Sequence, residues 1–280
     1  MSSPAITFST LNSPRNFDEL DTFLRIYETS HDQKVLPGVW MVLRLDGRGF
    51  TGFTERQAFE KPFDIRFRDT MVETTNYLMT EGGFSPIYGY TQSDEISLLL
   101  PQNSGIFDRK VRKLISIAAG IASGIFSLKV GQLAVFDCRV SQLPSWELVA
   151  KYFDWRQQDA ARNALNGYCY WKLRQSGKTV GQATKILNKA SVSFKNELLF
   201  KEFNINFNET PLWQRRGVGL YTLPYLKEGY NPITGETVVV ERRRVKVDEA
   251  LPMGLQYQEF LTNQFLGNPD ALNQTETTAV

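Results

Sequence analysis

The fold is decided by the stretch Val39-Trp40-Met41-Val42-Leu43-Arg44-Leu45-Asp46-Gly47-Arg48-Gly49-Phe50. Its first half is an almost unbroken apolar run, which is typical of a central strand covered on both faces. The run ends on the carboxylate of Asp46, and two glycines then frame Arg48. A carboxylate at the end of a buried strand, followed by backbone that can bend sharply, suits the binding of a metal ion and a triphosphate.

A second stretch has the same character: Ile87-Tyr88-Gly89-Tyr90-Thr91-Gln92-Ser93-Asp94-Glu95-Ile96-Ser97-Leu98-Leu99-Leu100. Two apolar segments flank a short polar break, and this pattern predicts a hairpin with Asp94 and Glu95 at or near its tip. If the hairpin lies beside the first strand, Asp46 and Asp94 face each other across one edge of a sheet. Two divalent cations need such a pair of carboxylates.

Composition narrows the possible chemistry. The chain has 280 residues, enough for one large or two small domains with a substantial core. Its net charge of +2 is too small to indicate nucleic-acid binding by itself, so any basic surface must come from local clustering. The two cysteines lack metal-ligand spacing and His31 is the single histidine. These counts disfavour a Cys/His zinc centre and a histidine-dependent nucleophile, and leave carboxylate and hard-cation chemistry.

We expect a cytoplasmic protein that does not bind a membrane. Residues 1–14 lack the charged and apolar regions of a secretory signal. The longest apolar stretch, residues 114–128, is too short to span a bilayer.

The order of predicted elements indicates an α+β fold. We expect a helix over 17–28, the first strand, a polar loop over 51–61, a helix from Pro62 to about Thr80, the hairpin, a helix over 107–129 and a strand over 133–140. Strand, helix, hairpin, helix, strand is the βαββαβ order of a ferredoxin-like palm, an antiparallel sheet with helices on one face. Nucleotide polymerases and nucleotidyl cyclases use such a sheet to hold two metals. We assign residues 37–141 to this palm-like catalytic core, after an N-terminal arm and helix over 1–36.

The second half predicts a helical and hairpin part over 142–266, packed on the palm. We expect helices over 146–173, 183–189 (opened by a capping box at Thr179) and 192–202, a short strand over 217–221, and a hairpin across 231–235. The tail over 267–280 has few apolar residues and is expected to be disordered.

The chemistry of these residues suits phosphoryl transfer. Asp46 and Asp94 can bridge two Mg²⁺ ions, with the Gly47 carbonyl as a further hard ligand. Backbone N–H groups from Gly47 to Thr51 can meet a triphosphate, which Arg44, Arg48 and Lys61 would neutralise. Other interpretations stay open. An Asp-Gly pair is often only a turn, and Ser93-Asp94-Glu95 could be a solvated loop tip. The charged run over 241–246 is either an exposed strand face or a surface for an RNA backbone.

Six blocks, in order from about Arg44 to Gly217, resemble the tRNA-His guanylyltransferase family. They are Leu45-Asp46-Gly47-Arg48-Gly49-Phe50, Lys61-Pro62-Phe63-Asp64, Gln92-Ser93-Asp94-Glu95, Phe136-Asp137-Cys138-Arg139-Val140, Trp155-Arg156-Gln157-Gln158-Asp159 and the run from Lys195 to Asn206. The resemblance implies a nucleotidyltransferase that adds nucleotides in the 3′-to-5′ direction to the 5′ end of tRNA. It implies ATP and GTP, or other nucleoside triphosphates, as substrates. It also implies a homo-oligomer, in this family a tetramer.

The resemblance also implies roles for individual residues. Metal ligands would be Asp46, the Gly47 carbonyl and Asp94. Nucleotide contacts would come from Asp46, Gly47, Arg48, Gly49, Phe50, Thr51, Ser93 and Asp94. Residues along the triphosphate and the tRNA 5′ end would be Lys61, Arg139, Lys195 and Asn206, with Lys61 and Lys195 serving catalysis beside Asp46 and Asp94.

One stretch departs from the eukaryotic members of the family. They carry His-Ile-Asn-Asn-Leu-Tyr-Asn, which the family links to choosing tRNA-His, where this chain has residues 161–167 (Ala-Arg-Asn-Ala-Leu-Asn-Gly). Thr91 also replaces a glycine. The pattern resembles the bacterial and archaeal guanylyltransferase-like proteins, which repair truncated tRNA 5′ ends by template-directed addition. The alternatives are a nucleotidyl cyclase, which shares the palm, and a non-catalytic tRNA-binding module.

Overall fold

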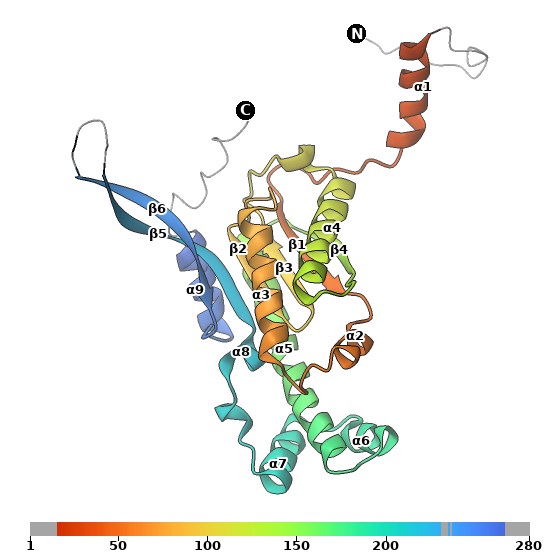
Figure 1. The fold of residues 1–280 in the computed structure, drawn as a ribbon, viewed down its shortest axis with the longest axis vertical. Coiled ribbons are helices and arrows are strands. Elements are labelled where there is room, and N and C mark those ends of the chain that lie inside the picture. The colour runs from red at the N-terminus through yellow and green to blue at the C-terminus, as the bar shows by residue number, and fades with distance from the viewer. Residues whose placement is uncertain (1–15, 231–234, 236, 267–280) are drawn as a thin grey trace.

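The protein is described here by a computed structural model that covers residues 16–230, 235 and 237–266. The predicted N-terminal arm (residues 1–15), the predicted disordered tail (267–280) and most of the predicted hairpin turn (231–234 and 236) lie outside the described residues. Figure 1 shows a central sheet with helices on both faces, and a two-stranded ribbon that extends away from it.

One antiparallel sheet of six strands forms the centre, in the order β4-β1-β3-β2-β5-β6. Its strands are β1 (Trp40–Gly47), β2 (Tyr88–Gln92), β3 (Glu95–Leu99), β4 (Phe136–Leu143), β5 (Val218–Tyr230) and β6 (Thr237–Asp248). The order β4-β1-β3-β2 is that of a βαββαβ palm, which confirms the predicted fold class. Because β5 pairs with β2, the C-terminal hairpin extends the palm sheet itself.

The two faces of the sheet are covered by different helices. Met41, Leu43 and Leu45 enter a core beneath α3 (Ile65–Thr80) and α4 (Val111–Val130), the two palm helices. Trp40 and Val42 point the other way, into a core shared with α5 (Trp146–Gln175) and α9 (Leu255–Phe265). Side chains alternate along a strand, so Arg44 and Asp46 lie on the α5 face at the end of β1.

Four predictions in the palm are corrected. The loop predicted over 51–61 begins as α2 (Phe50–Arg56), in which Phe50 and Phe53 lie one turn apart and are both buried. The helix predicted from Pro62 begins at Ile65, because the Asp64 side chain accepts a hydrogen bond from the backbone N–H of Arg66 (2.8 Å). A 3₁₀ turn over Ile106–Arg109 delays α4 to Val111, and β4 lies three residues later than the predicted strand.

In the second half, the predicted helices are confirmed and two more are found. The confirmed helices are α5, α6 (Val180–Leu187) and α7 (Val192–Phe203). Near the start of the chain, the helix predicted over 17–28 is also confirmed, as α1 (Phe17–Thr29). The capping box at Thr179 and Gln182 is present. Two short helices, α8 (Leu212–Arg216) and α9, were not predicted. The strand predicted over 217–221 continues to Tyr230, because its later residues pair with β6 beyond the end of β2.

The length of α4 corrects a further expectation. The apolar stretch judged too short to span a bilayer belongs to a helix of 20 residues with a mean hydropathy of 1.5. It is the one helix among the described residues that is long and apolar enough to cross a membrane. In the fold it is a palm helix, since its stripe of Leu114, Ala118, Ala122 and Phe126 is buried in the core against the sheet.

Candidate active site

The end of β1 meets the turn between β2 and β3. Asp46 pairs in register with Glu95 of β3 on one side and with Asp137 of β4 on the other. The Gly47 backbone N–H donates to the Asp94 carbonyl oxygen at 3.0 Å. The structure therefore brings Asp46 and Asp94 together at one edge of the sheet, which we call the palm edge.

The electrostatics of the palm edge favour a bound cation. Burial raises the pKa of the Asp94 carboxyl, and the negative charge of Asp46 raises it further. The Ser93 hydroxyl donates to Asp94 Oδ1 at 3.1 Å, from a left-handed turn position with a φ of 53°. On the β4 side of Asp46, Arg139 Nη2 lies 3.9 Å from Asp46 Oδ2 and 2.9 Å from Asp137 Oδ1. Because the charge of Asp46 disfavours the ionised form of Asp94, a cation between the two carboxylates would relieve their repulsion.

The residues present fit a divalent cation of the Mg²⁺ kind. Among the described residues no cluster of three or more His, Cys, Asp or Glu side chains could hold a metal. The palm edge offers a smaller set of ligands, namely the carboxylates of Asp46 and Asp94 and the backbone carbonyl of Gly47. Mg²⁺ commonly takes only one or two protein carboxylates and completes its shell with water and substrate phosphates.

Steric constraints explain the glycines after Asp46. A Cβ at Gly47 would lie 2.4 Å from Cδ2 of Phe50, and Gly49 has a φ of +71°. The chain therefore turns directly from β1 into α2. The side chain of Phe50 is buried among other phenylalanines, and that of Arg48 is exposed and lines neither of the two cavities described below. Any nucleotide contact in this segment therefore rests on backbone groups and on Phe50 and Thr51, which line one of these cavities.

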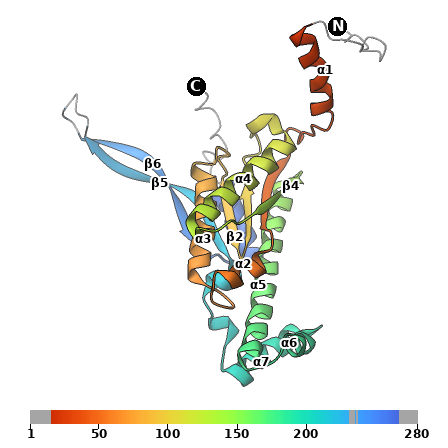
Figure 2. The ribbon, with the colours of Figure 1, turned by 45° about the vertical axis from the view of Figure 1, so that its right-hand side comes forward.

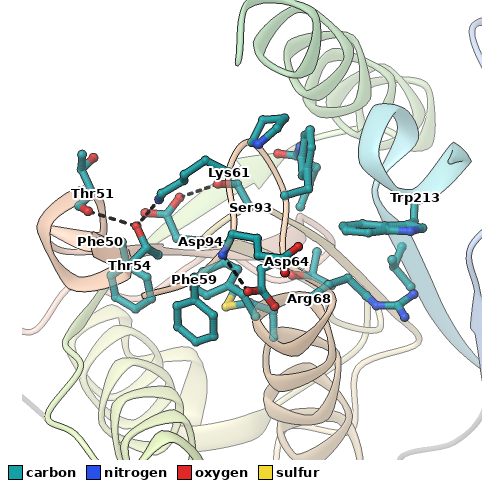
Figure 3. Close-up of a pocket in the computed structure, with 18 of the residues that line it drawn as sticks. Phe50, Thr51, Thr54, Phe59, Lys61, Asp64, Arg68, Ser93, Asp94 and Trp213 are labelled. Carbon is teal, nitrogen blue, oxygen red and sulfur yellow. Dashed lines mark hydrogen bonds between the residues drawn. The ribbon is translucent and has the colours of Figure 1, made fainter. Parts of the chain in front are cut away.

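One cavity, of about 230 Å³, opens on the α2–α3 side of the Ser93-Asp94 turn (Figure 3). We call it the aromatic cavity, because its walls include Phe59, Phe63, Trp171 and Trp213. Lys61 reaches into it from the loop before α3, donates a hydrogen bond to Thr54 Oγ1, and lies 5.6 Å from the ring centroid of Trp171. Burial lowers the pKa of Lys61, although the charges of Glu55, Asp64 and Asp94 oppose this shift.

A second cavity, of about 370 Å³, lies on the α5 side of the same turn. We call it the polar cavity. Glu95 joins two cations there: Arg44 Nε lies at 3.8 Å and Arg156 Nη1 at 3.4 Å from Glu95 Oε2. Arg156 also binds Asp159 at 2.7 Å. Burial raises the pKa of Glu95, against the lowering effect of Arg156 and Arg44.

Sequence reasoning assigned no role to Glu95 or Arg156. The signal was present in the block Trp155-Arg156-Gln157-Gln158-Asp159, whose three-residue and four-residue spacings put several polar side chains on one helix face. Only the packing of α5 on the sheet shows that this face meets the palm edge.

Two predicted residues lie elsewhere. Lys195 is half-buried on α7, and Asn206 caps a short 3₁₀ turn by accepting from the backbone N–H of Asn208 at 3.1 Å. Neither is among the described residues that line the aromatic or the polar cavity. Figure 2 shows α7 beyond the far end of α5, away from the sheet.

A palm sheet with paired carboxylates at its edge, set between two cavities, is typical of enzymes that act on nucleotide phosphates. The family model for tRNAHis guanylyltransferase matches residues 21–144, and the model for the Thg1 C terminal domain matches residues 147–251. The chain belongs to the tRNAHis guanylyltransferase family.

Individual relatives agree with the family models. The chain is 31% identical over 239 residues to the tRNA(His) guanylyltransferase of Debaryomyces hansenii. This alignment covers 80% of this chain and 89% of that protein. It is 35% identical over 196 residues to a probable tRNA(His) guanylyltransferase of Drosophila melanogaster, covering 66% and 68% of the two chains.

Solved structures show the same fold. The crystal structure of the Saccharomyces cerevisiae tRNA(His) guanylyltransferase matches with a TM-score of 0.65 and 25% identity, over 70% of this chain and 91% of that one. A bacterial tRNA(His) guanylyltransferase-like protein in complex with ATP matches with a TM-score of 0.68 and 26% identity, over 88% and 98% of the chains. The same bacterial type has also been solved in complex with GTP.

Proposed function

We propose that this protein adds nucleotides in the 3′-to-5′ direction to the 5′ end of tRNA, with the opposite strand of the acceptor stem as template. The observation that carries this proposal is that Asp46 and Asp94 lie beside each other at the turn where both cavities meet. A transfer between two phosphorylated substrates needs two binding spaces on either side of one reaction centre.

The aromatic cavity suits the nucleoside triphosphate. Its aromatic walls offer a surface for a base. The Lys61 ammonium group and the backbone N–H groups of Phe50 and Thr51, at the start of α2, can donate to phosphates. In the polar cavity, Arg44 Nε and Arg156 Nε are buried without a hydrogen-bond partner in the described part of the chain. Buried N–H groups of this kind favour an anionic ligand, and we assign this cavity to the phosphorylated 5′ end of the RNA.

The proposed steps are displacements at phosphorus. On a 5′-monophosphate end, a phosphate oxygen of the RNA attacks the α-phosphorus of ATP, and pyrophosphate leaves. The 3′-hydroxyl of the incoming nucleotide then attacks the 5′ phosphorus, its proton passes to water, and AMP leaves. A 5′-triphosphate end skips the first step and releases pyrophosphate. Asp46, the Gly47 carbonyl and Asp94 would hold Mg²⁺, which neutralises charge on the transferring group.

The lining of the polar cavity bears on substrate choice. Asn163, Ala164 and Gly167 border it from α5, within the stretch where the chain departs from its eukaryotic relatives. Base pairing selects a nucleotide without a protein side chain, so the protein needs only to hold the RNA backbone. We therefore expect repair of 5′-truncated tRNAs of more than one identity.

The test is kcat/KM on 5′-truncated tRNAs of several identities, measured beside full-length tRNA-His. Each tRNA is supplied with every nucleotide in turn. We expect addition of the nucleotide that pairs with the template base. Extension of tRNA-His alone, and only by G, would contradict template-directed repair. Formation of a cyclic nucleotide from ATP or GTP without RNA would favour the cyclase alternative.

A further inference from the structure

The side chain of Thr54, on α2, forms part of the wall of the aromatic cavity and is 9% exposed. Figure 3 shows its hydroxyl between the backbone of Thr51 and the side chain of Lys61. The hydroxyl donates to the Thr51 carbonyl oxygen at 3.0 Å and accepts a hydrogen bond from Lys61 Nζ. A carbonyl oxygen can only accept and a lysine ammonium group can only donate, so the direction of both hydrogen bonds is fixed.

Lys61 is held at both ends. Its backbone carbonyl oxygen accepts from Gln175 Nε2 of α5 at 3.3 Å. Its ammonium group donates to Thr54 and lies 5.6 Å from the ring centroid of Trp171. A lysine side chain has several rotatable bonds and loses much rotamer freedom when it is fixed. The hydrogen bond to Thr54 therefore orders this side chain before any ligand enters the cavity.

The charge of Lys61 has no direct counter-charge in the described part of the chain. There, Thr54 is the one group that accepts a hydrogen bond from the ammonium group, and no carboxylate lies within ion-pair distance of it. Its other N–H donors remain for a ligand. Partial burial of an ammonium group beside aromatic walls, without a paired carboxylate, costs free energy that an anionic ligand would offset.

The Thr54 hydroxyl also connects Lys61 to the helix that follows the palm edge. α2 begins at Phe50, shortly after Asp46, and Thr51 in its first turn supplies the carbonyl oxygen that orients the hydroxyl. The backbone N–H groups of Phe50 and Thr51, assigned above to phosphates, belong to the same turn. Thr54 therefore keeps the ammonium group of Lys61 beside the backbone donors that would meet the same triphosphate.

We propose that Thr54 is a positioning residue, which holds the Lys61 ammonium group in place for the phosphates of the nucleoside triphosphate in the aromatic cavity. This inference rests on the proposed function, because it takes the triphosphate assigned to that cavity as the ligand. Thr54 acts through Lys61 and not on the reacting atoms. A side chain that is already ordered loses less freedom when the phosphates bind, so the ligand binds more tightly than it would to a free lysine side chain.

The test is the dissociation constant of ATP, measured by calorimetry with the full-length chain and Mg²⁺ and without RNA. Thr54→Val keeps the shape of the side chain and removes the acceptor, and it should weaken ATP binding roughly tenfold. Thr54→Ala removes the same oxygen without adding a methyl group and should show a similar loss, so it decides the matter if Thr54→Val does not fold. Thr54→Ser keeps the hydroxyl and should bind ATP within about twofold of the wild type.

Thr74→Val is the matched control. Thr74 is a buried helical threonine whose hydroxyl donates to the Thr70 carbonyl oxygen at 2.8 Å, and in the described residues no lysine donates to it. This variant should bind ATP like the wild type. In a double-mutant cycle, Thr54→Val should cause no further loss when Lys61→Met is already present, because the two side chains act as a unit. Unchanged binding in Thr54→Val or Thr54→Ala overturns the proposal. So does an equal loss in Thr54→Ser or Thr74→Val, or a full further loss in the Lys61→Met background.

A second measurement separates this proposal from the proposed function. If the wild type binds ATP but extends no tRNA, the proposed function fails and the binding comparison still tests Thr54. If the wild type binds no ATP, the role of Thr54 is overturned whatever the RNA assay shows. At saturating ATP, Thr54→Val should keep kcat for tRNA extension within a few-fold of the wild type, because only binding is weakened. A tenfold or larger fall in kcat at saturation would place Thr54 in the reaction itself and overturn a positioning role in binding.

Discussion

The palm edge and the α7 end of the molecule both carry residues that the family resemblance marks as functional, but the structure assembles only the first. Asp46 and Asp94 lie together because the residues next to them are joined: Asp46 pairs with Glu95, and the Gly47 N–H donates to the Asp94 carbonyl oxygen. Lys195 and Asn206 lie on α7 and the turn after it, outside both cavities. The difference shows that residues in one sheet are placed by the pairing of its strands. The positions of residues on separate helices depend instead on how those helices pack.

The largest expected effect is at the palm edge. Asp46→Ala and Asp94→Ala should each lower kcat for nucleotide addition roughly a thousandfold or more, with the melting temperature near that of the wild type. Each change removes a carboxylate that balances the charge of the proposed cation. Single-turnover addition to a triphosphorylated tRNA, with Mg²⁺ varied, measures the loss directly.

Asp137→Asn is the matched control for these variants. Asp137 pairs with Asp46 on the same face, but its carboxylate faces Arg139 at 2.9 Å. It should keep activity within a few-fold of the wild type. A loss as large as that of Asp94→Ala would mean that the total negative charge of the edge matters, rather than the specific pair.

An intermediate effect is expected at Asp64, which holds the loop that carries Lys61. Its carboxylate caps α3, accepts from the Glu60 backbone N–H at 2.7 Å, and binds Arg66. The hydrogen bond from Arg66 is the main cause that lowers its pKa from 3.8 to about 2. Asp64→Ala should lower the free energy of unfolding by about 2 kcal/mol at pH 7.

The sign of the pH dependence follows from the lowered pKa. The stabilisation from Asp64 is fully present above pH 3.8 and is lost as pH falls toward 2. Urea unfolding of the wild type and Asp64→Ala should therefore show a difference that shrinks on acidification through this range. Asp69→Ala removes an exposed acid from the same helix and should change stability by less than about 0.5 kcal/mol. A difference that stays constant down to pH 2 would exclude this linkage.

The smallest effect is expected at Lys195. Lys195→Ala should reduce kcat/KM by a few-fold on monophosphorylated tRNA and less on triphosphorylated tRNA, if this lysine acts in the ATP-dependent activation step. Lys201→Ala, on the exposed face of the same helix and paired with Glu197, is the control. Equal losses on both RNA substrates would remove Lys195 from activation. A thousandfold loss would mean that the α7 end matters as much for catalysis as the palm edge.

The sequence by itself determined the palm and its acidic edge. The apolar run from Val39 predicted a buried strand, and the polar break at Ser93 predicted a two-strand hairpin, because strand periodicity and turn residues are local signals. The order of elements then left few ways to build the sheet. The blocks around Asp46 and Asp94 were enough to indicate the family.

Only the tertiary structure decided what surrounds that edge. Glu95 and Arg156 meet because α5 crosses the sheet, and Trp171 and Trp213 close the aromatic cavity from helices distant in sequence. The separation of Arg243 from Arg242 and Arg244, on opposite faces of the β5–β6 hairpin, required the register of these strands. Such placements depend on long-range packing, where a shift of one residue in register moves a side chain to the other face, and no local pattern in the sequence specifies that choice.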